Sequence, residues 1–296
     1  MIDGVVILDK PRGITSFRAV EKVGRILRQK KCGHAGTLDP MATGVLPICA
    51  GRATKIAGYI AAQDKDYDVS FRFGIATDTG DVTGREVESL PGGHAGREAV
   101  EAAVSALVGS WEQVPPAYSA VKVAGKRAYA LARQGKTVEL AARPVTVSEA
   151  RVVSWSPEGF RLFIRCTKGF YVRALARDLG KALGAPMAVS ELRRLRCGPF
   201  RAEDAVTLEA LAGAAARGES GTMTLTIGRA LEGFPKLAIP AEAADAVRHG
   251  RSPAPWLAGK ASVAAGGIVL LTRGDGEPVA LVARGAGGEW TIVRGI

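Results

Sequence analysis

The sequence predicts an α+β protein, with one large domain followed by a small β-rich unit. Two segments, 67–74 and 161–167, alternate apolar and polar residues in the way that half-buried strands do. Three other segments place apolar residues at helical spacing: 17–29, 97–108 and 172–183. After about residue 240, glycine-rich turns separate short apolar runs, which predict strands at 268–271, 279–282 and 290–293.

The N-terminal elements can be placed from short signals. The apolar run 5–8 predicts a buried strand, and it is too short and lacks the basic flank of a signal peptide. A turn follows at 10–13, after which Thr15 or Ser16 can cap the helix at 17–29. The apolar side of this helix is expected to consist of Phe17, Val20, Val23, Ile26 and Leu27.

The helix at 172–183 has a clear end and a notable first turn. Gly184 and Pro186 stop it, and its leucines at spacing four face inward. Arg173 lies in the first turn, next to the end of strand 161–167, from where its side chain can lean into a cleft.

Composition argues against several classes of protein. Of the 296 residues, 47% are hydrophobic and 23% charged, as in globular proteins, and no apolar run reaches the roughly 18 residues of a membrane span. The four cysteines are widely spaced, which favours reduced thiols and a cytoplasmic location. The three histidines are too scattered to suggest a metal site, and no Walker or G-x-G-x-x-G motif indicates a nucleotide cofactor.

The positive charge is concentrated in one part of the chain. The net charge is +11, and the segment 161–201 holds ten Lys/Arg against the two acids Asp178 and Glu191. The segment 241–296 holds six basic and five acidic residues. A concentrated, arginine-rich segment favours a polyanionic partner, although a charged, solvated surface is the other interpretation.

The segment 114–136 interleaves prolines, glycines, basic residues and the tyrosines Tyr118 and Tyr129. This composition predicts an excursion from the core that carries phosphate-binding and stacking groups. A plain connecting loop is the alternative that the composition alone leaves open.

The segment Gly33-His34-Ala35-Gly36-Thr37-Leu38-Asp39-Pro40 places one carboxylate in a short glycine-rich stretch. The glycines permit backbone angles and close approaches that a Cβ would prevent. Pro40 fixes its own φ and favours extended geometry at Asp39. Asp39 is therefore expected on a stiff loop that can aim its side chain, and an ordinary turn aspartate is the alternative.

Together with residues 41–47, this segment resembles the active-site motif of the TruB-type tRNA pseudouridine synthases. The similarity continues in order and register along most of the chain, and a looser similarity from Ile239 onward is to the PUA domain, a small RNA-binding barrel. The matching blocks are 8–11, 33–47, 65–67, 77–79, 115–129, 132–135, 143–144, 168–180 and 192–195.

The resemblance implies a fold, an activity and a partner. The fold would be the pseudouridine synthase fold, with a mixed, mostly antiparallel sheet in residues 1–238 and a PUA-like β-barrel in residues 239–296. The activity would be isomerisation of the T-loop uridine at position 55 of tRNA to pseudouridine. The partner would be the T-arm of tRNA, with no membrane and no obligatory protein partner. The reaction neither oxidises nor adds a group, so no cofactor is expected.

The resemblance also implies roles for six residues. Three residues would be catalytic: Asp39 would be the nucleophile, Arg173 would pair with it and favour its ionised form, and Tyr67 would stack on the flipped uracil and assist proton transfer. The substrate pocket would be lined by His34, Tyr171 and Leu192.

Two other functions remain open at this point. One is a non-catalytic RNA-binding or tRNA-folding protein, which would not require Asp39, Tyr67 and Arg173 together. The other is a guide-RNA-dependent synthase that works with protein partners. The short N-terminus and the lack of a lysine-rich tail lead us to expect a synthase that needs no guide.

Overall fold

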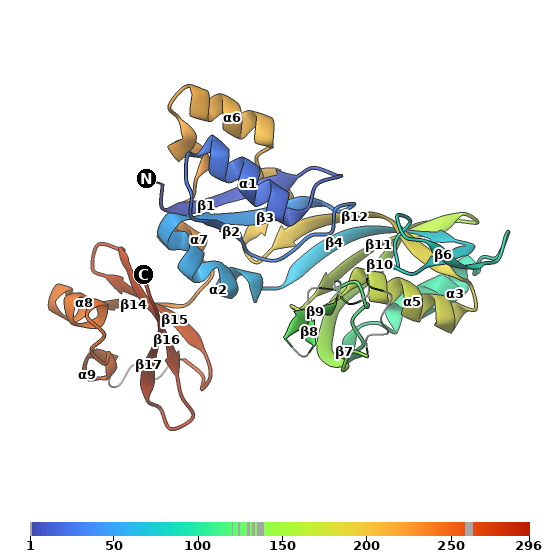
Figure 1. The fold of residues 1–296 in the computed structure, drawn as a ribbon. Helices are drawn as coiled ribbons and strands as arrows, with labels where there is room; N and C mark the ends of the chain where they lie inside the picture. The colour runs from blue at the N-terminus through green and yellow to red at the C-terminus, as the bar shows by residue number, and fades with distance from the viewer. Residues whose placement is uncertain are drawn as a thin grey trace.

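The protein consists of a long, twisted sheet with helices on it and a small C-terminal sheet at one end (Figure 1). The predicted α+β class is confirmed. The computed structural model describes residues 2–119, 121–123, 125–128, 131, 134, 139–257 and 263–296. Part of the predicted excursion, including Tyr129, Arg133 and Lys136, lies outside the described residues.

The large sheet is mixed and mostly antiparallel, as the resemblance implies. Its strands pair in the order β1, β3, β12, β4, β11, β10, β7, while β2 pairs with β3 and β13 with β12. β3 and β12 run parallel to each other. The strands are β1 (Gly4–Lys10), β2 (Cys32–His34), β3 (Thr43–Ala50), β4 (Lys65–Phe73), β7 (Gly109–Gln113), β10 (Arg143–Ser156), β11 (Gly159–Cys166), β12 (Met187–Cys197) and β13 (Phe200–Arg201).

The central strands show the alternation that the sequence predicts. Phe71 of β4 stacks on Phe160 of β11, with ring centroids 4.8 Å apart, in the larger hydrophobic core. All of the predicted inward residues on β4 and β11 are buried: Tyr67, Val69, Phe71, Phe73, Leu162, Ile164 and Cys166.

The two halves of the large sheet meet at a short seam between β3 and β12. Arg193 pairs with Thr43 and Arg194 with Gly44, whereas β12 and β4 pair along almost the whole of β12. Gly44 has a φ of +97°, and a Cβ on it would lie 2.2 Å from the backbone oxygen of Arg194. Only glycine fits at this contact.

Helices cover the sheet at both ends, and two short hairpins extend from it (Figure 1). The hairpins are β5 (Ile75–Thr77) with β6 (Glu86–Ser89), and β8 (Lys122–Val123) with β9 (Lys126–Arg127). The helices of this part are α1 (Ser16–Ile26), α2 (Ala57–Ala61), α3 (Arg97–Ser105), α5 (Val172–Leu183), α6 (Leu208–Ala216) and α7 (Ile227–Ala230).

The predicted helix 172–183 is confirmed residue for residue, whereas the first helix differs from its prediction. α5 ends at Gly184 in the left-handed conformation. α1 is capped by Thr15 but ends at Ile26. The assignment of Phe17 to the apolar side of this helix is wrong, because its side chain is 67% exposed. Ser16 occupies the inward position at the start of the helix, and the next residue points about 100° away from it.

The small sheet has the strand order β14, β15, β16, β17 and its own buried core. Its three predicted strands are confirmed, whereas the sequence did not predict β14 or the helices α8 and α9. Tyr59 connects this sheet to the large domain by donating to the carbonyl of Val293 at 3.1 Å. The elements are β14 (Lys236–Ile239), α8 (Ala241–Arg248), α9 (Ala254–Leu257), β15 (Ile268–Arg273), β16 (Pro278–Arg284) and β17 (Trp290–Gly295).

Candidate active site

Asp39 lies on the loop between β2 and β3, and the sequence of this loop restricts its backbone. Gly36 has a φ of +102°, a conformation that favours glycine, and Pro40 restricts Asp39. Gly33 shows no left-handed φ, and an added Cβ would meet nothing within 4 Å. The expected need for glycine at position 33 is therefore wrong, whereas that at position 36 is confirmed.

The segment after β1 holds this loop from one side. The buried Ser16 hydroxyl accepts from the amide of Leu38 at 2.8 Å and donates to the carbonyl of Leu38 at 2.9 Å. The carbonyl of Pro40 accepts from the amide of Gly13 at 2.8 Å and from Lys10 Nζ at 3.4 Å. The residues on both sides of Asp39 therefore have fixed positions.

Arg173, from the first turn of α5, makes a bidentate ion pair with Asp39. Its Nε donates to Oδ2 at 2.8 Å and its Nη2 to Oδ1 at 3.0 Å. The arginine side chain is 7% exposed and the aspartate side chain 33% exposed. Two charge-assisted bonds between planar groups fix the carboxylate orientation, while its partial exposure leaves it open to a substrate.

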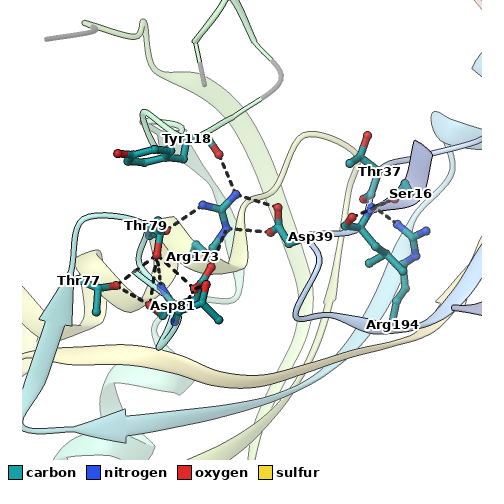
Figure 2. Close-up of polar contacts among 11 residues, drawn as sticks. Ser16, Thr37, Asp39, Thr77, Thr79, Asp81, Tyr118, Arg173 and Arg194 are labelled. Atoms are coloured by element: carbon teal, nitrogen blue, oxygen red, sulfur yellow. Dashed lines mark hydrogen bonds and ion pairs between the residues drawn. The ribbon is translucent and has the colours of Figure 1, made fainter. Parts of the chain in front are cut away.

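The guanidinium of Arg173 is held on its other sides as well (Figure 2). Nη1 donates to the carbonyl of Thr79 at 2.8 Å, and Nη2 donates to the carbonyl of Tyr118 at 2.8 Å. The buried carboxylate of Asp81 lies 3.8 Å from Nε. With these partners the guanidinium cannot swing away from Asp39 without losing several hydrogen bonds.

A second arginine, Arg194 of β12, lies on the other side of the Asp39 loop and is 1% exposed (Figure 2). Its Nε donates to the carbonyl of Val45 at 2.7 Å. Its Nη2 donates to the carbonyl of Gly36 at 3.1 Å, and its Nη1 donates to that of Thr37 at 3.4 Å. Arg194 therefore ties β12 to the loop that carries the carboxylate.

Tyr67 reaches the same region through Arg194. Its side chain is 9% exposed, and burial raises the pKa of its phenol above the ordinary value, against a charge and a hydrogen bond from Arg194. The phenol is therefore protonated at neutral pH. Its predicted role of stacking on uracil stays a prediction.

His34 and Tyr171 lie near the two arginines. His34 Nδ1 is buried and has no hydrogen-bond partner among the described residues. Burial lowers the pKa of His34, and the charge of Arg194 lowers it further, so the imidazole is neutral at pH 7. The backbone of Tyr171, at the start of α5, is held by the side chain of Gln113, and burial raises the pKa of its phenol.

Leu192 precedes Arg194 by two residues, so both lie on the same face of β12. It is 6% exposed and belongs to the larger hydrophobic core. Its predicted place in a substrate pocket, like those of His34 and Tyr171, stays a prediction.

Much of the predicted basic segment is neutralised by carboxylates from other strands. Arg161 pairs with Asp68 of β4, and Arg193 pairs with Asp9 of β1. Asp66 of β4 accepts from both Arg165 and Arg196. The charge count within the segment 161–201 therefore overstates the positive charge that is free to meet a polyanion.

The sequence did not single out Ser16, Asp81, Arg194 or Lys10 as residues of this site. Ser16, Arg194 and Lys10 bond to backbone groups, and such bonds leave no signal in a sequence. Burial lowers the pKa of Lys10 to about 8, although the charge of Asp39 opposes this shift.

Within the described ranges, no group of three or more His, Cys, Asp or Glu side chains could hold a metal ion. Over the same part of the chain, no helix is long and apolar enough to cross a membrane.

Comparison with known proteins identifies the family. Residues 24–172 match the model for the N-terminal domain of TruB family pseudouridylate synthases, and residues 173–232 match that for the C-terminal domain of tRNA pseudouridylate synthase B. The tRNA pseudouridine synthase B of Chromohalobacter salexigens is 45% identical over 250 residues, which cover 84% of this chain and 81% of that protein. That of Thermobifida fusca is 42% identical over 301 residues, which cover 99% and 98%.

Solved structures show the same architecture. A chain in the crystal structure of a Cbf5-Nop10-Gar1 complex superposes with a TM-score of 0.77 at 25% identity, covering 99% of this chain and 83% of that one. The pseudouridine synthase fold implied by the motifs is thus confirmed. With a family model matched over half of its length and relatives more than 40% identical, the chain belongs to the TruB family of pseudouridylate synthases, which are isomerases.

Proposed function

We propose that this enzyme converts the T-loop uridine at position 55 of tRNA to pseudouridine, with Asp39 as the nucleophile and without a cofactor or an obligatory protein partner. The bidentate pair between Asp39 and Arg173, on a loop held from two sides, is the observation that carries this proposal. The names of the relatives, tRNA pseudouridine synthase B, support the substrate class.

The arrangement suits a reaction in which a base is detached, turned and reattached. Carboxylates are established nucleophiles in sugar chemistry, and an attacking carboxylate can hold one fragment covalently while the other moves. Arg173 orients the Asp39 carboxylate through two hydrogen bonds and, because it is fixed, requires no reorganisation during the reaction. Nothing is oxidised or added, so the residues of this chain can carry the whole isomerisation.

Tyr67 completes the proposed catalytic set, and His34, Tyr171 and Leu192 are assigned to substrate binding. Tyr67 would stack on the uracil that has left its loop, and such stacking is worth about 1–3 kcal/mol per base. We propose that His34, Tyr171 and Leu192 line the pocket for that base. Their neutral imidazole, phenol and aliphatic side chains suit an uncharged ring.

We further propose that residues 239–296 form a PUA-like domain that contacts RNA outside the catalytic site. The four-stranded sheet with α8 and α9 supports this assignment. Its first strand, β14, begins at Lys236, just before the proposed boundary.

The test uses purified protein and an unmodified tRNA transcript, without other factors, and maps pseudouridine along the product. Wild type should modify position 55, and Asp39→Asn should bind the transcript but show no turnover. Asp204→Asn, which changes an exposed aspartate elsewhere, serves as the control and should retain activity. Turnover by Asp39→Asn at the wild-type rate would rule out the nucleophile assignment. If wild type binds but modifies nothing without an added guide RNA, the proposal of an independent synthase is wrong.

A further inference from the structure

The helix α1 has an exposed face that combines an aromatic side chain with positive charge. Phe17 at its start is 67% exposed, and Arg18, Lys22 and Arg25 are exposed along the same face. Ala19 and Val23 on the opposite face are buried. An exposed phenylalanine among cations is an unusual surface, because a large apolar side chain gains most from burial.

The positive charge around α1 is not neutralised. The segment 12–31 contains seven Lys/Arg and one acid, Glu21. Among the described residues, the only ion pair in this segment is that of Arg18 with Glu21. Lys22 and Arg25 remain exposed without an acidic partner there, in contrast to Arg161, which pairs with Asp68.

The helix α1 begins next to the candidate active site. Ser16, the first residue of α1, is hydrogen-bonded to Leu38, next to Asp39. The helix has eleven residues, so its face extends about 16 Å from the site. Figure 1 shows α1 beside α6, on the side of the large sheet that faces away from the small C-terminal sheet.

We propose that the exposed face of α1 binds the phosphate backbone of the RNA stem adjoining the loop whose uridine reaches Asp39, and that Phe17 packs on a ribose or base at the stem–loop junction. This inference rests on the proposed function and deepens it. A row of cations complements a phosphate backbone, whereas an aromatic ring suits an unstacked nucleotide near the loop. The position of Phe17 at the active-site end and of Lys22 and Arg25 farther along matches this order.

The first test compares two double variants that each remove two positive charges. Lys22→Gln/Arg25→Gln removes cations without an acidic partner among the described residues. Arg97→Gln/Arg161→Gln removes exposed arginines that pair with Glu101 and Asp68. Binding of the full-length protein to an unmodified tRNA transcript is measured between about 50 and 200 mM salt.

The α1 double variant should reduce the slope of log affinity against log salt by about 1.4–1.8, as expected for two lost phosphate contacts at 0.7–0.9 each. The paired double variant should reduce the slope by clearly less. The proposal is overturned if both variants change the slope equally or if the α1 variant leaves it unchanged.

The second test addresses Phe17. Phe17→Ala should weaken binding of a T-arm stem-loop by about tenfold without changing the salt slope, because the side chain carries no charge. Val108→Ala, another exposed apolar residue, is the matched control and should leave affinity unchanged. Unaltered RNA affinity of Phe17→Ala, with a change in self-association instead, would identify a protein contact and overturn the RNA assignment.

The substrate's length separates this proposal from the proposed function. An oligonucleotide that contains only the loop should bind wild type and the α1 double variant alike, whereas the stem-loop should distinguish them. Equal stem-loop binding by both proteins, with an active wild type, would reject the α1 surface alone. A wild type that makes no pseudouridine would reject the proposed function, while the binding comparison would still decide the role of α1.

Discussion

Arg173 and Arg194 are both almost fully buried and lie on opposite sides of the Asp39 loop (Figure 2), but their partners differ. Arg173 donates hydrogen bonds to both oxygens of the Asp39 carboxylate and to the backbone carbonyls of Thr79 and Tyr118. Arg194 bonds three carbonyls, two of them in the loop. One guanidinium therefore binds the carboxylate of Asp39 directly and the other holds the loop that carries it, and the two should fail in different ways.

The largest effect is expected at Arg173. Arg173→Met should lower turnover by roughly 10²–10³-fold, the range seen when a fixed electrostatic donor is removed from an active site. Arg173→Lys should also be damaging, because a point charge cannot replace the planar fork. The measurement is single-turnover pseudouridine formation at saturating tRNA.

Arg177→Met is the matched control, since Arg177 lies one turn along α5 and its side chain is 37% exposed. It should keep turnover close to wild type. If the Arg173 variants changed only tRNA affinity, Arg173 would be a phosphate contact and the contrast with Arg194 would disappear.

Arg194→Met should reduce the stability of the protein. It leaves buried carbonyl oxygens without donors, at a cost of about 1–3 kcal/mol for each one that stays unsatisfied. Urea unfolding measures this loss, and Arg194→Lys should recover part of it by bonding one or two of the three carbonyls. Equal stability of Arg194→Met and wild type would show that the loop does not depend on this guanidinium.

Ser16→Ala should have a smaller effect of the same kind. It removes both hydrogen bonds to Leu38, for which a loss of about 1–3 kcal/mol is expected. Thr15→Ala is the control, because it removes the cap of the same helix without touching the loop. In a double-mutant cycle, Ser16→Ala should couple to Arg194→Lys through the shared loop by about 0.5 kcal/mol or more. Strict additivity would show that the two anchors act independently.

The smallest effect is a pKa change at His34. Burial and the charge of Arg194 both lower the pKa of His34 below its ordinary value of 6.5. The pKa should therefore rise in Arg194→Met and stay low in Arg194→Lys, as measured by an NMR titration of the imidazole signals. A pKa that is identical in all three proteins would show that the charge of Arg194 does not reach His34.

The sign of the stability change follows from this pKa. The unfolded chain binds a proton near pH 6.5, and the native imidazole binds one only at lower pH. The contribution of His34 to stability should therefore fall as the pH decreases from about 7 through the native pKa. A His34→Gln variant should lack this part of the pH dependence.

The sequence predicted well those features that depend on local pattern. α5 was predicted residue for residue, because leucine spacing and Gly184 mark it, and β4 was predicted from its alternation. Phe17 was misassigned because a residue in the first turn can lie at the edge of the apolar stripe. The strand β14 was not predicted, because its alternation is short and weak.

The sequence pattern predicted less of the candidate active site than of the fold. The pairing of Asp39 with Arg173 joins residues far apart in the chain, and only the resemblance indicated it. Arg194 appeared in the sequence as one more member of a basic segment. The alternation of β12 places it inward with Leu192, and its partners are backbone carbonyls that no composition reveals. The acids that neutralise the segment lie on other strands, so counting charges along the chain could not find them.

Backbone pairing between neighbouring strands of the large sheet is much shorter at the seam between β3 and β12 than on either side of it. Only two backbone pairs join β3 to β12, but the side chains of Arg193 and Arg194 add bonds across this seam to Asp9, Val45 and the Asp39 loop. Side chains rather than the sheet ladder therefore make most of the polar contacts between the two halves. Asp39 is carried by one half, and Arg173 follows the strands of the other. A rotation of the halves about this joint would separate Asp39 from Arg173, so the side chains of Arg193 and Arg194 that span the joint also preserve this ion pair.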